Sequence, residues 1–192
     1  MSEHIDFSQR DPHPSLDALF HQRWSPRAYA ETPVNADDLA LVIEAARWSP
    51  SCFNEQPWRF WTSNEETHAQ FLELLVEGNQ VWAKQAPVIG VIGAFKTHAA
   101  NGNPNGWAVF DAGAAWMAMN MQARKLGLYA HGMAGVHFDA VYEALDIDRE
   151  QIEVVCAFTL GSIGDPERLP EMLQEREKPT PRKPIDEIWL QK

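Results

Sequence analysis

The chain has 192 residues, of which 45% are hydrophobic and 22% charged, and its formal net charge is −11 at pH 7. This length and composition are typical of a globular protein with a sizeable buried core. Because the chain is acidic and has no basic run, nucleic acid is excluded as an expected partner. A small anionic ligand is still compatible, since two or three arginines can create a local positive site on an acidic protein.

The cysteine content and hydropathy narrow the class further. The only cysteines are Cys52 and Cys156, and no Cys/His cluster has metal-ligand spacing, so neither a disulfide framework nor a metal site is expected. No segment reaches the roughly 18 apolar residues of a membrane span, and the first 14 residues lack the apolar region of an export signal. We therefore expect a cytoplasmic protein without a membrane partner.

In the first half of the chain, Asn35 is predicted to cap a helix over about residues 36–47. Residues 58–62 alternate aromatic and polar side chains and indicate a strand. Residues 65–77 are predicted to be helical, with Gly78 at the C-terminal stop. Residues 87–95 form an apolar run that is typical of a strand buried on both faces.

In the second half, residues 101–106 indicate a loop, and Asp111 is predicted to cap a helix that ends near residue 127. This helix is apolar on almost every side, so it belongs in the centre of the fold or in a subunit interface. Residues 138–146 indicate a short helix and 153–161 a second buried strand. Because helices and strands alternate, we expect mixed α and β structure around a central sheet.

We expect one domain over residues 1–192, because no linker divides the sequence. It begins with a polar N-terminal arm over residues 1–14. It ends with a Pro-rich, charged tail over residues 164–192, whose last apolar residues are Ile185, Ile188, Trp189 and Leu190. Apolar residues at a terminus need burial, so this tail is predicted to pack on a partner subunit.

Two segments carry side chains suited to ligand binding. Arg23 and Arg27, with Ser25 between them, offer guanidinium forks and a hydroxyl to one group of anionic oxygens, although a solvated surface turn has the same composition. The loop over residues 49–58 contains Ser51 and Asn54, which suit the polar edge of a heterocycle. A purely structural connection between helix and strand is the alternative for this loop.

Together these motifs resemble the nitroreductase family of FMN flavoproteins. The resemblance is carried by Arg-x-Ser-x-Arg at residues 23–27 and by Pro-Ser-x-x-Asn-x-Gln-Pro-Trp at residues 50–58. The apolar helix followed by residues 130–135, Ala-His-Gly-Met-Ala-Gly, is similar to the central helix of the family and the turn that passes the flavin ring. Arg182 lies in a segment similar to the closing motif of the family, although a charged tail would look alike.

The resemblance implies an α+β fold with a mixed sheet flanked by helices, assembled as an intertwined homodimer with FMN at the subunit interface. The FMN-binding residues that it implies are Arg23, Ser25, Arg27 and Arg182 from one chain, Pro50, Ser51 and Asn54 from the other, and Gly132, Met133, Ala134 and Gly135 beside the ring. Asn79 and Trp82 are implied near the substrate pocket, with a core position equally open for Trp82. We expect structural roles for His131 and His137, and no side chain as an acid/base catalyst.

The implied activity is hydride transfer from NADPH or NADH through flavin N5 to a small acceptor, such as a nitroaromatic or a quinone, in a ping-pong mechanism. Alternatives on the same frame are reductive dehalogenation, dehydrogenation of a small substrate, and flavin binding without turnover. A nucleotide-binding protein without flavin is disfavoured, because the sequence contains neither GxGxxG nor a P-loop.

Overall fold

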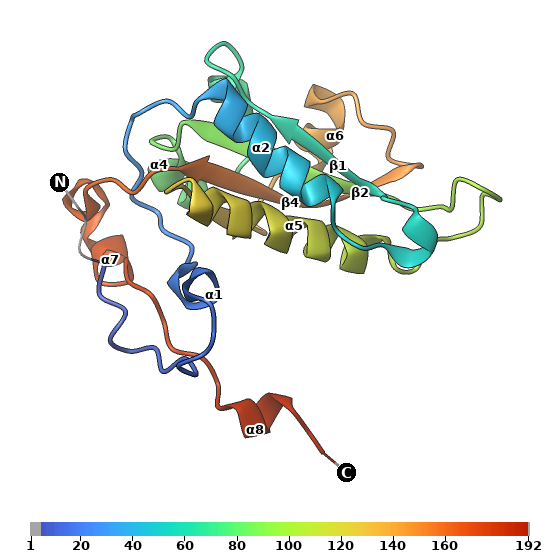
Figure 1. Cartoon of the computed structure of the whole chain (residues 1–192). Coiled ribbons are helices and arrows are strands. Elements are labelled where there is room, and N and C mark those ends of the chain that lie inside the picture. Colours follow the sequence, from blue (N-terminus) through green and yellow to red (C-terminus); the bar gives the residue numbers. More distant parts are fainter. Residues whose placement is uncertain (1–4, 192) are drawn as a thin grey trace.

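The computed structural model of the chain describes residues 5–191 (Figure 1). Residues 1–4 of the predicted arm and Lys192 of the predicted tail lie outside the described residues. Within residues 5–191, no helix has the length and hydropathy needed to cross a bilayer.

The centre of the fold is a four-stranded sheet with the order β1-β2-β4-β3. The strands are β1 (Trp58–Thr62), β2 (Val88–Phe95), β3 (Tyr129–Met133) and β4 (Ile152–Gly161), and each neighbouring pair is antiparallel. The α+β class is confirmed, but the expected mixed sheet is wrong for the described strands. The segment that joins β1 to β2 starts and finishes at the same end of the sheet. The segment that joins β3 to β4 does so too. Only the crossover from β2 to β3 joins parallel strands, and β4 lies between them.

The longer helices are α2 (Ala36–Arg47), α4 (Glu77–Ala83), α5 (Ala108–Lys125) and α6 (Phe138–Ala144). The shorter ones are α1 (Ala18–Gln22), η1 (Cys52–Asn54), α3 (His68–Glu73), η2 (Pro166–Arg168), α7 (Glu171–Gln174) and α8 (Ile185–Ile188). The predicted helix over 36–47 is confirmed to the residue, and the side chain of Asn35 caps it by accepting from the Asp37 N–H at 2.8 Å.

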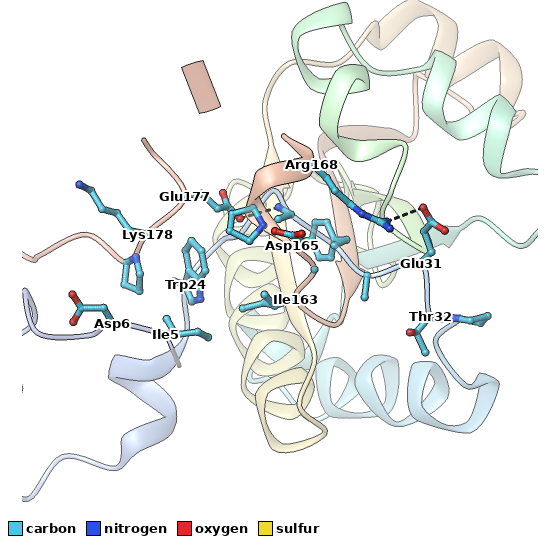
Figure 2. A pocket seen from close by; sticks show the side chains of 17 residues that line it. Ile5, Asp6, Trp24, Glu31, Thr32, Ile163, Asp165, Arg168, Glu177 and Lys178 are labelled. Carbon is cyan, nitrogen blue, oxygen red and sulfur yellow. Dashed lines mark hydrogen bonds and ion pairs between the residues drawn. The ribbon is translucent and has the colours of Figure 1, made fainter. Parts of the chain in front are cut away.

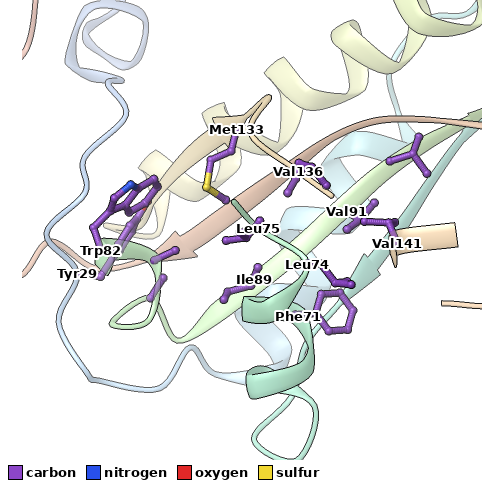
Figure 3. Packing of buried hydrophobic residues seen from close by; sticks show 14 of the residues in the cluster. Tyr29, Phe71, Leu74, Leu75, Trp82, Ile89, Val91, Met133, Val136 and Val141 are labelled. Atoms are coloured by element: carbon purple, nitrogen blue, oxygen red, sulfur yellow. The ribbon is translucent and has the colours of Figure 1, made fainter. Parts of the chain in front are cut away.

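The sheet separates two buried clusters, one on each face. Helices α2 and α5 pack together on one face, where Val42, Ala112 and Met119 meet Ile92 and Phe158. On the other face, residues of α3, α4 and α6 cover Ile89 and Val91 (Figure 3). Residues of β2 alternate between the two clusters, so the prediction of a strand buried on both faces is confirmed.

The single helix predicted over residues 65–77 is wrong. The chain forms α3 and α4 instead. Between them, Leu75 forms an isolated bridge with Val136, and Val76 is extended. The N–H of His137 donates to the Leu74 carbonyl at 2.8 Å, and the N–H of Val76 donates to the Gly135 carbonyl at 3.2 Å. These bonds to a distant segment replace the local helical bonds, so Gly78 lies inside α4 rather than at a helix end.

The predicted cap at Asp111 is also wrong, because α5 begins one turn earlier, at Ala108. The carboxylate of Asp111 is buried and accepts from the Cys52 N–H at 3.0 Å. Asp111 therefore connects α5 to the loop that contains Ser51 and Asn54.

One face of α5 remains apolar and exposed. Ala112, Ala115 and Met119 are buried against the sheet, whereas Phe110 is 72% exposed and Met117 38%. In the tail, Ile185, Ile188, Trp189 and Leu190 are at least 62% exposed, and α8 projects away from the sheet (Figure 1). Both surfaces are unusual for a free monomer and are suited to contact with another chain.

Candidate functional site

The segment from Arg23 to Arg27 has no regular secondary structure and leads from α1 to a bridge between Tyr29 and Ile163. Trp24 and Tyr29 are buried, and Trp24 packs edge-on against Tyr129 with ring centroids 6.4 Å apart. Burial alternates along the segment: Trp24 and Pro26 are buried, whereas Arg23, Ser25 and Arg27 are half-buried. The segment is therefore fixed by its buried residues and presents its polar ones.

These polar side chains line a cavity of about 410 Å³. Of the residues predicted to bind FMN, the structure brings Arg23, Ser25, Arg27 and Arg182 together here. The remaining lining residues are Arg10, Trp24, His131, Glu175, Arg176, Lys178 and Thr180. Sequence reasoning missed Arg10, Arg176 and Lys178, because no motif distinguishes them from solvated surface charges.

The cavity is strongly cationic. Burial lowers the pKa of Arg23, and the nearby Arg182 lowers it further. The pKa of Arg10 is lowered by burial and then by the charges of Arg182 and Arg23. Among the ion pairs within residues 5–191, none involves Arg10, Arg23, Arg27 or Arg182. Guanidinium groups that repel one another and lack carboxylate partners form a site suited to an anion.

Two tail contacts hold this segment in place. One carboxylate oxygen of Glu177, Oε1, accepts from the backbone N–H groups of Arg27 and Ala28 at 2.7 and 2.8 Å. Burial raises the pKa of Glu177. In addition, the Arg10 guanidinium donates to the carbonyls of Arg23 and Thr180. The tail and the arm are thus part of the cavity's framework.

His131 connects β3 to the arginine segment. Its Nδ1 lies 2.8 Å from the carbonyl oxygen of Pro26, and because a carbonyl only accepts, Nδ1 carries the hydrogen. Burial lowers the pKa of His131 to about 4, with smaller contributions from the charges of Arg27 and Arg23. The ring stacks on Trp82 at 4.7 Å. These contacts support a structural role for a neutral His131.

Asn79 and Trp82 both lie on α4, but they differ in burial and in contacts. Trp82 is buried in the core beneath His131, and the Arg27 guanidinium lies 6.0 Å from its ring centroid. Asn79 is half-buried, and its Nδ2 donates to the Gly135 carbonyl at 3.0 Å. The sequence left open whether Trp82 lies near the substrate pocket or in the core. The structure therefore favours the core.

Gly132 and Met133 end strand β3, and Ala134 and Gly135 follow it, so the predicted turn is partly strand. A Cβ on Gly135 would lie 2.6 Å from Nδ2 of Asn79 and 2.7 Å from Cγ2 of Val76. Glycine is required at this position by the close approach of Val76 and Asn79 at the start of α4. Gly132 is exposed, with Trp116 as the neighbour of such a Cβ at 3.4 Å.

The loop with Pro50, Ser51 and Asn54 is strained and internally fixed. Phe53, Asn54 and Gln56 have φ angles of 52°, 58° and 50°, which non-glycine residues rarely adopt. Ser51 Oγ accepts from the Gln56 N–H at 3.0 Å. Strain of this kind persists where surrounding bonds over-determine the loop, and it clusters at functional sites.

Within one chain, this loop and the arginine segment lie at opposite ends of the sheet (Figure 1). Trp58 after the loop pairs with Ala94, which pairs with Glu153 at the start of β4. The arginine segment reaches the sheet at Ile163, beyond the other end of β4. A strand of ten residues is about 33 Å long. Pro50, Ser51 and Asn54 therefore lie far from Arg23, Ser25 and Arg27 of the same chain.

A second cavity, of about 1040 Å³, lies beside the same segment (Figure 2). Trp24, Glu31, Arg168 and Glu177 are among its lining residues, and Arg168 pairs with Glu31 at 3.0 Å. Trp24 Nε1 and Glu177 Oε2 are buried and have no hydrogen-bond partner among the described residues. None of the residues predicted to bind FMN lines this cavity.

Comparison with known proteins decides the family. The model of the Nitroreductase family matches residues 21–162, which include the arginine segment, the strained loop and β3. The chain belongs to the nitroreductase family. Its motif resemblance to that family is thereby confirmed.

Solved structures of this fold extend the comparison. An oxidoreductase described as containing FMN is 38% identical, with a TM-score of 0.90 over 95% of this chain and 94% of that one. A protein from Desulfovibrio desulfuricans, crystallised with FMN, is 22% identical with a TM-score of 0.74 over 95% and 98% of the two chains. At this lower identity the likeness shows the nitroreductase fold alone.

A curated relative from Streptomyces coelicolor is 36% identical over 76 residues, 39% of this chain and 38% of its own length. It carries the provisional name NADH dehydrogenase/NAD(P)H nitroreductase. The chain spans about two fifths of the length of the curated relatives that it matches at 32–36% identity.

Proposed function

We propose that the chain is an FMN-dependent oxidoreductase that takes hydride from NADPH or NADH and reduces a small organic acceptor, such as a nitroaromatic or a quinone. The observation that carries this proposal is the cationic cavity around Arg23, Ser25, Arg27 and Arg182 in a chain of the nitroreductase family. The FMN of the 38% identical oxidoreductase and the provisional name of the Streptomyces relative support it.

The residues of the cavity fit the phosphate of FMN. A phosphate monoester carries about −1.5 to −2 charges at pH 7 and three acceptor oxygens. Among the described residues Arg23, Arg27 and Arg182 form no ion pair, although the charge of Arg27 acts on the Glu177 carboxylate. Their guanidinium groups can therefore bind the phosphate. In this proposal the arginines hold the phosphate, and the Ser25 hydroxyl adds a shorter hydrogen bond.

The polar edge of the flavin ring would be held by residues beside this cavity. His131 contacts both the arginine segment and Trp82, so β3 begins near the phosphate and leads to Gly132, Met133, Ala134 and Gly135. We assign these four residues to backbone contacts with the ring. Asn79 holds the Gly135 carbonyl and thereby orients this backbone next to the substrate pocket.

A second copy of the chain completes the proposed site. Pro50, Ser51 and Asn54 lie too far from the arginines of their own chain, so we assign them to the FMN of the partner in a homodimer. The exposed apolar face of α5 and the exposed apolar residues of the tail support such a dimer, because association would bury them. The tail would then pack on the partner subunit.

FMN, when bound, supplies the centre that accepts hydride from a reduced nicotinamide and passes reducing equivalents to the second substrate. The described side chains supply binding, orientation and charge, and none is assigned to acid/base catalysis. Nicotinamide and acceptor would use one pocket in turn, which gives ping-pong kinetics.

The test is an absorbance spectrum of the protein after addition of FMN and desalting, repeated without oxygen after addition of NADPH and then NADH. The proposal predicts flavin bands that survive desalting and bleach with at least one donor. Bands that persist with both donors would contradict the assigned reductase activity. Loss of all flavin on desalting would contradict the FMN site itself.

A further inference from the structure

The N-terminal arm contributes an arginine to the cationic cavity. Arg10 is the only lysine or arginine among the first 14 residues, and it lines the same cavity as Arg23 and Arg182. It belongs to neither family motif, and it lies before the matched residues 21–162. Its role must therefore be judged from its contacts.

The guanidinium of Arg10 joins three segments of the chain. Nη1 donates to the Arg23 carbonyl at 2.8 Å and to the His21 carbonyl, and Nε donates to the Thr180 carbonyl at 3.0 Å. The arm, the arginine segment and the tail thus meet at one side chain. Each of these partners is a backbone carbonyl, so the bonds fix the position of Arg10 and leave its charge unneutralised.

Part of the Arg10 guanidinium is left for a ligand. An arginine has five N–H donors, and the three bonds use both hydrogens of Nη1 and that of Nε. The two hydrogens of Nη2 have no hydrogen-bond acceptor among residues 5–191. The guanidinium carbon lies 5.7 Å from the ring centroid of Phe7, so an aromatic ring covers part of the group.

The surrounding positive charges favour the binding of an anion at this position. Arg10, Arg23 and Arg182 line one cavity, and the pKa of Arg10 is lowered by burial and then by the charges of Arg182 and Arg23. Such a cluster is electrostatically unfavourable when empty and favourable around a phosphate, which accepts several charge-assisted bonds.

We propose that Arg10 is a further phosphate-binding residue, and that a bound phosphate monoester fastens the N-terminal arm and the tail onto the Arg23–Arg27 segment. This inference rests on the proposed FMN site, since the phosphate is that of FMN. It goes beyond that proposal in making the arm a part of the binding site. Riboflavin, which lacks the phosphate, should fill the ring site without fastening the arm.

The first test compares dissociation constants for FMN and riboflavin by flavin fluorescence, in wild type and in Arg10→Ala. We expect Arg10→Ala to weaken FMN binding roughly 10- to 100-fold, the range for one charge-assisted contact, and to leave riboflavin binding within about twofold. Arg10→Lys keeps the charge but loses the planar fork, so it should restore part of the FMN affinity. Arg149→Ala is the matched control, because Arg149 is an exposed residue paired with Asp139 on α6.

The second test needs no variant. Trypsin cleaves after Arg10 when the arm is accessible, and mass spectrometry identifies the fragment. In wild type, saturating FMN should slow this cleavage at least about fivefold, whereas saturating riboflavin should leave its rate unchanged. This comparison decides the proposal even if Arg10→Ala does not fold.

Failure of the proposed role of Arg10 can be distinguished from failure of the proposed function. If wild type does not bind FMN, the proposed function fails and the role of Arg10 fails with it. If wild type binds FMN but Arg10→Ala binds it equally well, only the role of Arg10 is overturned. Equal losses of FMN and riboflavin affinity in Arg10→Ala, or equal protection from trypsin by both flavins, would show that Arg10 only holds the arm in place. Either result would also overturn the proposed role of Arg10.

Discussion

At the scale of single residues, the candidate site depends on cations that the protein leaves unpaired. Three surface arginines elsewhere in the described chain form ion pairs with carboxylates: Arg47 with Glu44, Arg149 with Asp139 and Arg168 with Glu31. Arg23 and Arg27 form no ion pair among the described residues, although the chain is acidic overall. Unpaired, partly buried charges are costly, and a ligand phosphate is the simplest explanation for keeping them.

Arg27→Ala tests this explanation. The substitution removes a guanidinium that lines the cavity and lies over the Trp82 ring. We expect FMN binding to weaken by about 1.5–3 kcal/mol, the typical value of a hydrogen bond to a charged group. Equilibrium titration with FMN measures the change, and unchanged affinity would remove Arg27 from the site.

His131 predicts a pH dependence of stability. Its pKa of about 4 in the folded chain lies below the usual 6.5 of the unfolded chain, so the unfolded state binds more protons between these values. The free energy of unfolding should therefore fall as the pH drops from about 6.5 to 4, by roughly 1.4 kcal/mol for each pH unit. His131→Asn keeps a donor for the Pro26 carbonyl and should remove this slope in urea unfolding. An imidazole that titrates near pH 6.5 by NMR would contradict the assignment.

At the scale of elements, the sequence predicts those structures that are decided locally. Helix α2 follows from its Asn35 cap and apolar spacing, and β2 from its apolar run. The break between α3 and α4 was not predictable, because it depends on the hydrogen bonds His137 N–H to Leu74 carbonyl and Val76 N–H to Gly135 carbonyl. Arg10 was missed for the same reason, since its partners include the distant Thr180. The motif arginines were found because one short segment carries them.

Gly135→Ala tests the packing of this non-local contact. The added methyl group would meet Asn79 and Val76 at less than 3 Å, so we expect the free energy of unfolding to fall by about 1–3 kcal/mol. Gly78→Ala on the neighbouring helix α4 is the control. No atom lies within 4 Å of its added Cβ, so stability should rise by about 0.5–1 kcal/mol. Equal effects of the two substitutions in urea unfolding would refute the close approach.

At the scale of the whole molecule, the single chain holds the parts of the proposed site at two ends of the sheet. The arginine cavity lies near the end of β4, and the loop with Ser51 and Asn54 lies near its start. The exposed face of α5 and the exposed tail offer the surfaces through which a second copy would bring these ends together. We therefore expect dimerisation and cofactor binding to be coupled.

Subunit mixing tests this coupling. Arg27→Ala disables the arginine side of the site, and Asn54→Gly removes the loop side chain while tolerating the φ of 58°. A heterodimer of the two variants, isolated with two affinity tags, has one fully intact shared site and should retain about half of the wild-type FMN. If each site belonged to one chain, the heterodimer would retain no more FMN than the two parental variants.

A crystal structure of the protein grown with FMN would test the proposed shared binding site most directly. We expect the phosphate between Arg23, Arg27 and Arg182, and the ring between residues 132–135 of one chain and the loop with Ser51 and Asn54 of the partner. Flavin bound elsewhere, for example in the 1040 Å³ cavity beside Glu177, or held by one chain alone, would contradict it.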